Sequence, residues 1–449
     1  MNSTNPRDIA VSVLVDVNMG GAYNNIRLRN ALSASGLSRA DKAFITEIVN
    51  GVLRNRIYLD YALGAYSKTP LAKLKPFVRE TMRCAAYQMI FMDRVPQFAA
   101  CNEAVKLIKN RGMHGLAPFV NGVLRNLARG KDELVMPNPG TLEYLCMKYS
   151  YEPWLLEYWL EHYGWHMLEE ICRAFALPPS ISIAVNTQKI STDQLAQELR
   201  EEGIEVRPGS FEDSLVISSL PDIASLDAFK NGSFMVMDES SIMAVRALGG
   251  ISKAWPGLIM DVCSAPGSKA FYAAWLSGGK ASIHAFDIHE HKLQLMAKAA
   301  VRLGVSSVKI ALADARKPLE GYEERAGAVL VDGPCSGFGL IRKKPDIKYR
   351  KKMEDVEQLA ALQRKILANV SGYVAPGGVL VYSVCTISAL ECEQQALWFA
   401  ENYPFELEEI DNTEGMPGIF RLGKGMVQIL PIGGNSDGFF IAKFRRRKS

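Results

Sequence analysis

Two cysteines of this chain lie in short polar turns that follow buried apolar runs. Cys335 lies in Asp332–Gly337 (DGPCSG), and Cys385 lies in Tyr382–Thr386 (YSVCT). A third turn of this kind, Asp261–Lys269 (DVCSAPGSK), lies upstream. Two thiols beside a nucleotide-like cofactor could add a thiolate to a pyrimidine ring, which prepares carbon 5 of the ring to take a methyl group. The three turns therefore predict covalent catalysis on a nucleobase.

Chemistry alone does not decide which thiol attacks. Addition to carbon 6 breaks the aromaticity of the ring, and a ring nitrogen must gain a proton as the thiolate adds. Asp332 is positioned to face that nitrogen, and a carboxyl buried near a second charge would suit the role of the acid. Taken alone, a cysteine at a strand end is usually a small buried apolar residue, so a packing role is the alternative for each thiol.

Short apolar runs alternate with helical segments from residue 241 onward, which is typical of a doubly wound, mostly parallel sheet. Ligands of such sheets bind beyond the carboxyl ends of the strands, where all three turns fall. The expected strands are Leu258–Val262, Ala281–Phe286, Val308–Leu312, Ala328–Val331 and Val379–Tyr382; the expected helices include Lys269–Ser277, Lys292–Leu303 and Val356–Val370.

Acidic residues end the first three of these runs. Asp261 precedes a Pro-Gly turn that leads into a helix, where free backbone N–H groups can meet a carboxylate. Asp287 lies about where an acid binds ribose hydroxyls, and Asp314 is well placed for an adenine amino group. Each aspartate alone is more often a cap or turn residue. The absence of a G-x-G-x-x-G loop disfavours a dinucleotide, so we expect S-adenosylmethionine as the cofactor.

The chain before residue 241 has a different character. Residues 1–135 are expected to form a helical bundle, in which Ser38 caps a helix and Gly115 and Gly122 punctuate another. Residues 136–240 are expected to form a small α+β module, and residues 241–449 the cofactor-binding domain. Residues 1–131 hold 19 Lys and Arg against 8 Asp and Glu, or +11, whereas the remainder carries −7. This asymmetry indicates a polyanionic partner or, about equally, a solvated helical surface.

Bulk composition excludes several classes of protein. The 449 residues are 48% hydrophobic and 22% charged, as in globular proteins of two or three domains. We expect no signal peptide, no membrane span and no metal site, and the eight scattered cysteines favour free thiols in a reducing cytoplasm. The basic tail 444–449 is expected to be frayed.

Several motifs in the same order resemble the RNA 5-methylcytosine methyltransferases of the Nol/Nop/Sun family. Asp261–Lys269 resembles the family's DxCAAPGGKT turn, Asp332–Gly337 its DAPCSG, and Tyr382–Thr386 its YSTCT. Glu391–Glu393 resembles its ENE, and Asp437–Ala442 (DGFFIA) another signature. The front segment is similar to the NusB-type RNA-binding bundle. The likeness to the bacterial Sun/Fmu type covers essentially the whole chain.

The resemblance implies a fold and a function. It implies a Rossmann-like class I methyltransferase domain, preceded by an all-α NusB-like bundle and a small α+β module, that methylates carbon 5 of a cytosine in small-subunit (16S) rRNA or its precursor. The alternatives are a non-catalytic RNA-binding assembly factor and a DNA cytosine methyltransferase, whose nucleophile would be Cys335. Membrane and DNA partners are not expected.

The resemblance also assigns roles. Cys385 becomes the nucleophile and Cys335 the residue for product release, while Lys269 matches the family's motif lysine and would orient the cytosine or lower the pKa of a nearby thiol. Cofactor contacts are implied for Cys263, Ser264, Ala265, Pro266, Gly267, Ser268, Lys269, Asp287, Asp314 and Asp332. Departures from the family pattern remove no group needed for the chemistry; they include Ser264 for Ala, Ser268 for Gly, Gly333 for Ala, Val384 for Thr and Cys392 for Asn. The basic run 342–352, next to the Cys335 turn, is expected to contact RNA phosphates.

Overall fold

The computed structural model describes residues 5–19, 21, 23–34, 36–217, 223–251, 257–411, 415–434 and 436–448. The chain forms two compact units. The first comprises Met1–Ala176 and Lys343–Arg350, and the second comprises Leu177–Arg342 and Lys351–Ser449. Among the described residues, no helix combines the length and apolar character needed to cross a bilayer.

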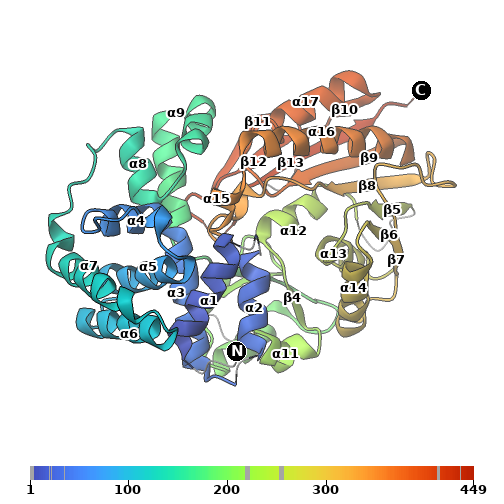
Figure 1. Cartoon of the computed structure of the whole chain (residues 1–449). Helices are drawn as coiled ribbons and strands as arrows, with labels where there is room; N and C mark the ends of the chain where they lie inside the picture. Colours follow the sequence, from blue (N-terminus) through green and yellow to red (C-terminus); the bar gives the residue numbers. More distant parts are fainter. Residues whose placement is uncertain are drawn as a thin grey trace. The chain divides into compact units, whose positions relative to one another are not determined.

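The first unit is helical, as the spacing of its apolar residues predicts (Figure 1). Ser38 caps α3, because its side chain accepts a hydrogen bond from the Asp41 amide at 3.1 Å. α9 contains one break, where Gly164 adopts φ +70°. The helices are α1 (Pro6–Met19), α2 (Asn24–Ala34), α3 (Arg39–Arg54), α4 (Arg56–Gly64), α5 (Pro76–Phe91), α6 (Gln97–Asn110), α7 (Ala117–Gly130), α8 (Leu142–Tyr149), α9 (Pro153–Ala176) and α15 (Ile347–Arg350).

A small antiparallel sheet begins the second unit, with the strand order β2-β3-β1-β4. Strands and helices alternate along this part of the chain, as expected of an α+β module. Its elements are β1 (Ile181–Val185), α10 (Thr192–Glu201), β2 (Val206–Pro208), β3 (Ser214–Ile217), α11 (Asp227–Lys230) and β4 (Phe234–Val236).

The larger sheet has the order β11-β12-β13-β9-β8-β5-β6-β7, and β10 also pairs with β13. The strands from β9 to β7 are parallel, which confirms the predicted mostly parallel sheet. Its strands are β5 (Leu258–Asp261), β6 (Ser282–Asp287), β7 (Val308–Leu312), β8 (Ala326–Asp332), β9 (Val374–Val384), β10 (Phe405–Leu407), β11 (Ile419–Gly423), β12 (Met426–Ile429) and β13 (Phe439–Arg446). Its helices are α12 (Glu239–Arg246), α13 (Ser268–Leu276), α14 (Glu290–Leu303), α16 (Met353–Val370) and α17 (Glu393–Asn402).

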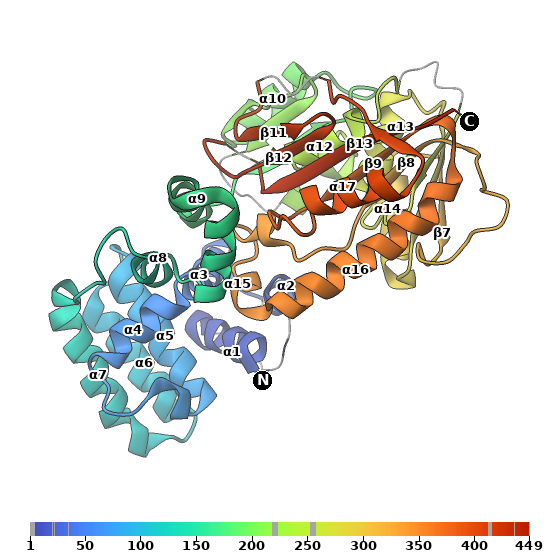
Figure 2. The same ribbon diagram turned by 90° about the horizontal axis from the view of Figure 1, so that it is seen from above.

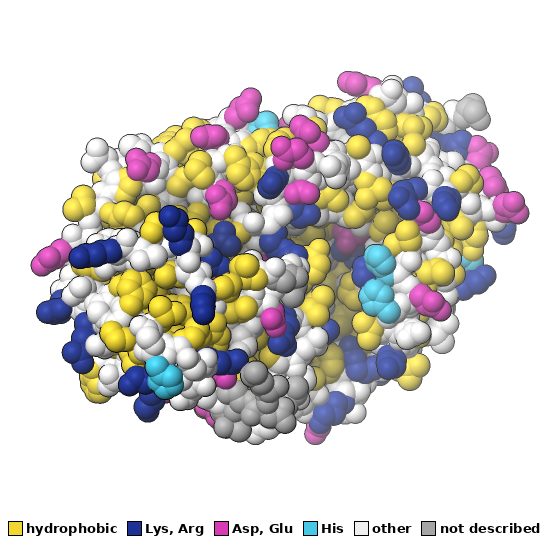
Figure 3. Space-filling model, viewed as in Figure 1, with side chains coloured by type: hydrophobic (Ala, Val, Ile, Leu, Met, Phe, Trp, Pro, Cys, Tyr) yellow, Lys and Arg dark blue, Asp and Glu magenta, His cyan; other side chains and the backbone are white. Residues whose placement is uncertain are grey.

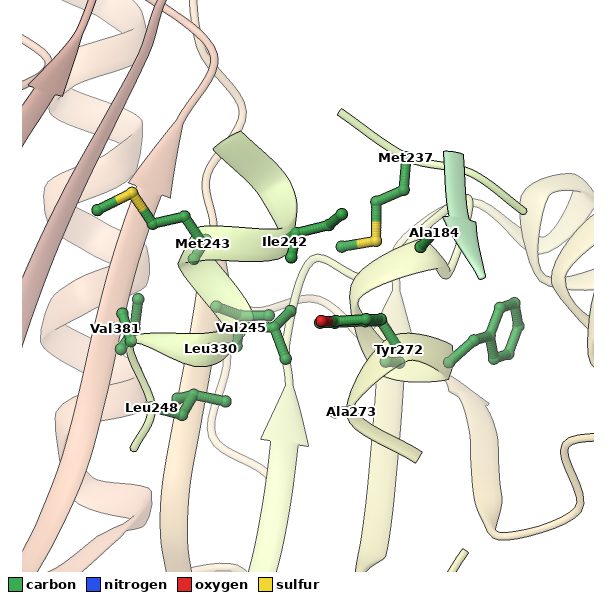
Figure 4. Close-up of a cluster of buried hydrophobic side chains, with 14 of the residues drawn as sticks. Ala184, Met237, Ile242, Met243, Val245, Leu248, Tyr272, Ala273, Leu330 and Val381 are labelled. Carbon is green, nitrogen blue, oxygen red and sulfur yellow. The ribbon is translucent and has the colours of Figure 1, made fainter. Parts of the chain in front are cut away.

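Helices cover both faces of this sheet. Leu330 and Val381 face a core with α12, α13 and α14, whereas their neighbours Val331 and Tyr382 face a core with α16 and α17. Figure 4 shows the first core, where side chains of α12 and α13 meet over Leu330 and Val381. Figure 2 shows α16 running along the sheet beside α17. Because side chains alternate along a strand, these apolar runs can be buried on both faces.

Residues 444–446 of the basic tail form part of a strand, contrary to our prediction of a frayed tail. β13 continues to Arg446 and pairs with β9 and β10. Phe444 is fully buried, and Arg445 hydrogen-bonds the Glu408 carboxylate. Tail charges paired with acids, and apolar side chains alternating into the core, explain why a basic sequence here forms a strand.

Candidate active site

The predicted chemical residues follow the carboxyl ends of parallel strands. Asp261 ends β5, Asp287 ends β6 and Asp332 ends β8. Asp314 follows β7 by two residues, and Cys385 directly follows β9. Parallel pairing of β7-β6-β5-β8-β9 therefore brings five turns, far apart in the sequence, to one edge of the sheet.

The two cysteine turns meet at this edge. The Cys335 and Cys385 Sγ atoms lie 3.3 Å apart, and both thiols are free and partly buried. The hydrogen bond with Cys385, together with burial, raises the pKa of Cys335 well above its usual value. Cys335 therefore keeps its proton at neutral pH, which disfavours it as the group that attacks first.

Lys269 and Asp332 form an ion pair beside the cofactor loop. Lys269 Nζ lies 2.7 Å from Asp332 Oδ2, and the Ser383 hydroxyl donates to Asp332 Oδ1 at 2.9 Å. Burial alone would lower the pKa of Lys269, but the Asp332 carboxylate outweighs it and raises this pKa. The ammonium also lies 5.5 Å from the centre of the Phe439 ring. Lys269 is thus held as a cation at the edge where both thiols lie.

The loop after β5 contains a glycine in the left-handed backbone region, just before α13 begins. Gly267 adopts φ +100°, and a Cβ at this position would lie 2.6 Å from Cε2 of Phe271. The Ala265 amide donates to Asp287 Oδ2 at 3.2 Å, and the His289 amide donates to Asp287 Oδ1 at 3.0 Å. Glycine is therefore required where the loop enters α13, and Asp287 anchors the loop to β6.

Asp314 is engaged by its neighbour Arg316. The guanidinium donates to both carboxylate oxygens, at 2.8 and 2.7 Å, and these bonds lower the pKa of Asp314 to about 2. Asp314 therefore stays ionised at physiological pH and presents a carboxylate at the end of β7.

Two further acids are functional candidates to which the sequence analysis assigned no role. Asp261 is buried, and burial raises its pKa to about 7. Its Oδ2 accepts from the Ser264 hydroxyl at 2.8 Å, whereas Oδ1 has no hydrogen-bond partner among the described residues. Ser264, a departure from the family pattern, thus supports this carboxyl. Glu391 is fully buried behind the Cys335 turn; the ENE-like motif was the available signal.

Two of the seven cations in the basic run 342–352 are buried, whereas the other five are partly or fully exposed, and their contact with RNA phosphates stays a prediction. Arg342 is buried, and its guanidinium donates to the Pro431 and Ser436 carbonyls. Lys348 is buried in the first unit and donates to the Arg54 and Tyr149 carbonyls at 2.8 Å. Backbone acceptors satisfy these cations, so a charge count overstated what the run offers to phosphates.

Comparisons with known proteins agree with this arrangement. A model of the 16S rRNA methyltransferase RsmB/F matches residues 254–445, a NusB family model matches residues 4–129, and a ferredoxin-like domain model of RsmF/B-like methyltransferases matches residues 151–224. The chain is 37% identical to the probable ribosomal RNA small subunit methyltransferase B of Bacillus subtilis, with both chains covered in full. The chain belongs to this methyltransferase family.

Two further similarities extend over nearly the whole chain. Ribosomal RNA small subunit methyltransferase B of Thermus thermophilus is 30% identical, with both chains covered in full. The crystal structure of the protein PH0851 superposes with a TM-score of 0.82 at 26% identity, covering 98% of this chain and 99% of that one. The predicted family, its NusB-like front and its Rossmann-like methyltransferase domain are confirmed; ligand contacts of the individual site residues stay a prediction.

Proposed function

We propose that this protein transfers a methyl group from S-adenosylmethionine to carbon 5 of a cytosine in small-subunit (16S) rRNA or its precursor, through a covalent adduct with Cys385. The observation that carries the proposal is the pair of thiols 3.3 Å apart at the strand edge that also holds the Lys269–Asp332 ion pair. A methyltransferase acting on oxygen or nitrogen needs no thiol nucleophile, whereas methylation of carbon 5 of a pyrimidine uses one, and a second thiol beside it can serve the release step.

The residues of the cofactor loop fit S-adenosylmethionine. Asp287 and Asp314 supply carboxylates for ribose and adenine, at the ends of β6 and β7. The unpartnered Oδ1 of Asp261 is buried and suits a cationic group such as the ammonium of the cofactor. When bound, the cofactor supplies an electrophilic methyl group on a sulfonium.

In the first half of the reaction, the Cys385 thiolate bonds to carbon 6, and the ring nitrogen takes a proton as the electrons move onto the ring. Asp332, which accepts hydrogen bonds from Lys269 and Ser383, takes up a proton from solution and passes it to that nitrogen. Carbon 5 then behaves as an enamine and accepts the methyl group.

Release of the methylated RNA requires that the thioether bond to Cys385 be broken. Once Cys385 is bonded to the ring, the hydrogen bond that raises the pKa of Cys335 is lost, so Cys335 can give up its proton. Its thiolate takes the proton from carbon 5, and the ring nitrogen returns its proton to Asp332. The double bond between carbons 5 and 6 forms again, and the bond from carbon 6 to Cys385 breaks, which leaves Cys385 as a thiolate. Both cysteines end the cycle free.

The first unit is the expected source of RNA affinity. It contains the NusB-like helices and the segment with a net charge of +11. Figure 3 shows Lys and Arg side chains spread over the face in view, with hydrophobic side chains between them. Such a surface suits phosphate contacts, while the target cytosine must leave its stack to reach the thiols.

Incubation with methyl-labelled S-adenosylmethionine tests the function. We expect label in small-subunit rRNA as 5-methylcytosine, and none in DNA of matching sequence. Label in DNA alone would support a DNA methyltransferase, and RNA binding with no label would support an assembly factor. Mapping 5-methylcytosine in rRNA from cells without this protein identifies the target.

Variants of the two cysteines test the mechanism. Cys385→Ala is expected to abolish methyl transfer and adduct formation. Cys335→Ala is expected to methylate once and remain bound to RNA, visible as a shifted band on a denaturing gel. The opposite pattern would assign the nucleophile to Cys335.

A further inference from the structure

Glu391 is a buried carboxylate that the reaction above does not use. It lies between the Cys385 turn and α17, and its exposed fraction is 0%. Its Oε1 accepts from the Ser336 amide at 2.8 Å and from Gln363 Nε2 at 3.0 Å, and its Oε2 accepts from the Ser336 hydroxyl at 2.5 Å. The carboxylate thus accepts two hydrogen bonds from Ser336, the residue that follows Cys335.

These hydrogen bonds fix the Cys335 turn from both sides. Gln363, which bonds Glu391, also donates to the Pro334 carbonyl at 2.9 Å. The residue before Cys335 and the residue after it are therefore both tied, directly or through Gln363, to one carboxylate. A turn constrained at both neighbours has little freedom to move its central side chain.

The same network joins the Cys335 turn to the Cys385 turn. The Ser336 and Thr386 hydroxyls are 2.7 Å apart, and the Tyr382 hydroxyl donates to the Glu391 carbonyl at 2.7 Å. Tyr382 and Thr386 lie on either side of Cys385 in the sequence. Glu391 therefore contacts Ser336 through its carboxylate and Tyr382 through its backbone carbonyl, and a substitution of its side chain removes only the first of these contacts.

The surroundings of the Glu391 carboxylate differ from those of an acid at the protein surface. Burial is the largest influence on Glu391 and raises its pKa, while hydrogen bonds from Ser336, Gln363 and Ser388 oppose that effect. These partners are neutral, and a buried carboxylate without a cation is costly unless its hydrogen bonds are well formed. Loss of any of these hydrogen bonds would therefore be costly, because it would leave a buried carboxylate oxygen unsatisfied.

We propose that Glu391 is a positioning residue for the release step: its carboxylate holds the Pro334–Ser336 turn so that the Cys335 thiol stays within reach of carbon 5 in the Cys385 adduct. This inference rests on the proposed function. Glu391 touches neither the base nor the cofactor. Cys385 leads directly out of β9, whose ladder with β8 and β13 positions it independently, so methyl transfer depends less on Glu391 than release does.

The test separates the two halves of the reaction in the full-length protein. Glu391→Ala is expected to keep single-turnover methyl transfer within a few-fold of wild type but to slow release on the order of 100-fold, so that methylated RNA adduct accumulates. Glu391→Gln, which keeps the shape and one carbonyl oxygen, is expected to rescue release in part. Glu393→Gln makes the same chemical change two residues away and is expected to behave as wild type.

Each result decides the proposal. Equal losses in methyl transfer and release, or unchanged release, in Glu391→Ala would overturn it. If that variant does not fold, Gln363→Met takes its place with the same expectations, because it removes the bonds to the Pro334 carbonyl and to Glu391 Oε1. Failure of wild type to methylate RNA, or of Cys335→Ala to trap an adduct, would instead refute the proposed function.

Discussion

The buried Asp261 carboxyl predicts an unusual dependence of stability on pH. Burial raises its pKa to about 7 in the folded protein, against about 3.9 in the unfolded chain. Between these values the folded state binds more protons than the unfolded state, so stability falls as the pH rises from about 4 to about 7. At 1.36 kcal/mol for each pKa unit, the carboxyl costs about 1.5 kcal/mol at pH 5 and about 4 kcal/mol at pH 8.

Asp261→Asn removes the charge while it keeps the shape of the side chain. The cofactor-free variant is therefore expected to gain about 4 kcal/mol over wild type at pH 8 and about 1.5 kcal/mol at pH 5. For a unit of this size the gains correspond to roughly 8 °C and 3 °C in melting temperature. Thermal unfolding followed by calorimetry at the two pH values measures them.

Two further variants check the cause. Ser264→Ala removes the hydroxyl that donates to Asp261 Oδ2 and favours its ionised form, so it should lose more stability at pH 8 than at pH 5. Asp411→Asn changes an exposed aspartate and should shift neither melting temperature. Equal gains for Asp261→Asn at both pH values, or a loss at pH 8, would refute the argument that an ionised buried carboxyl destabilises the free protein.

Three other outcomes are expected. Gly267→Ala should weaken binding of S-adenosylmethionine at least tenfold by calorimetry, because its Cβ would lie 2.6 Å from the Phe271 ring at φ +100°; unchanged affinity would contradict this. Diamide should join Cys335 and Cys385 in a disulfide, seen by mass spectrometry of peptides, and abolish methylation until dithiothreitol restores it; activity that survives complete oxidation would contradict it. Burial lowers the pKa of Lys348, so the unfolded chain binds more protons than the folded one and wild type should gain stability as the pH rises from 7 to 9. Lys348→Met should remove this part of the pH dependence of the first unit.

The sequence was most informative where its signals are local. The run Val308–Leu312 is β7 itself, and the other expected strands of the parallel sheet differ from those observed mainly at their ends. Short apolar runs between helices require parallel strands, and parallel strands place their last residues at one edge. The closeness of Cys335 and Cys385 follows from this rule, since β8 and β9 are neighbours in the sheet.

Signals that depend on distant partners could not be read in advance. Glu391 is an acid just before a helix, which suggests a solvated position; its burial depends on Ser336, 55 residues away, and on Gln363. Likewise, the charge of Lys348 suggests phosphate binding, but its carbonyl partners lie on helices nearly 200 and 300 residues away in the sequence. Local sequence reports the charge of a side chain, and only the fold reports its partners.

The segment Lys343–Arg350 determines which experiment can measure the contribution of the first unit to RNA binding. It leaves the second unit eight residues after Cys335 and belongs to the first, where Tyr349 donates to the Ser150 carbonyl at 3.0 Å and stacks under the Arg56 guanidinium at 3.6 Å. A fragment that starts at residue 135 would leave this segment without Arg54 and Arg56, and it would split the first unit before α8. Loss of activity in such a fragment would then report exposed apolar and aromatic surface as readily as lost RNA contacts. The contribution of the first unit to RNA affinity is therefore better measured in the full chain, by replacing exposed lysines and arginines of that unit and following the slope of affinity against salt concentration, which reports phosphate contacts directly.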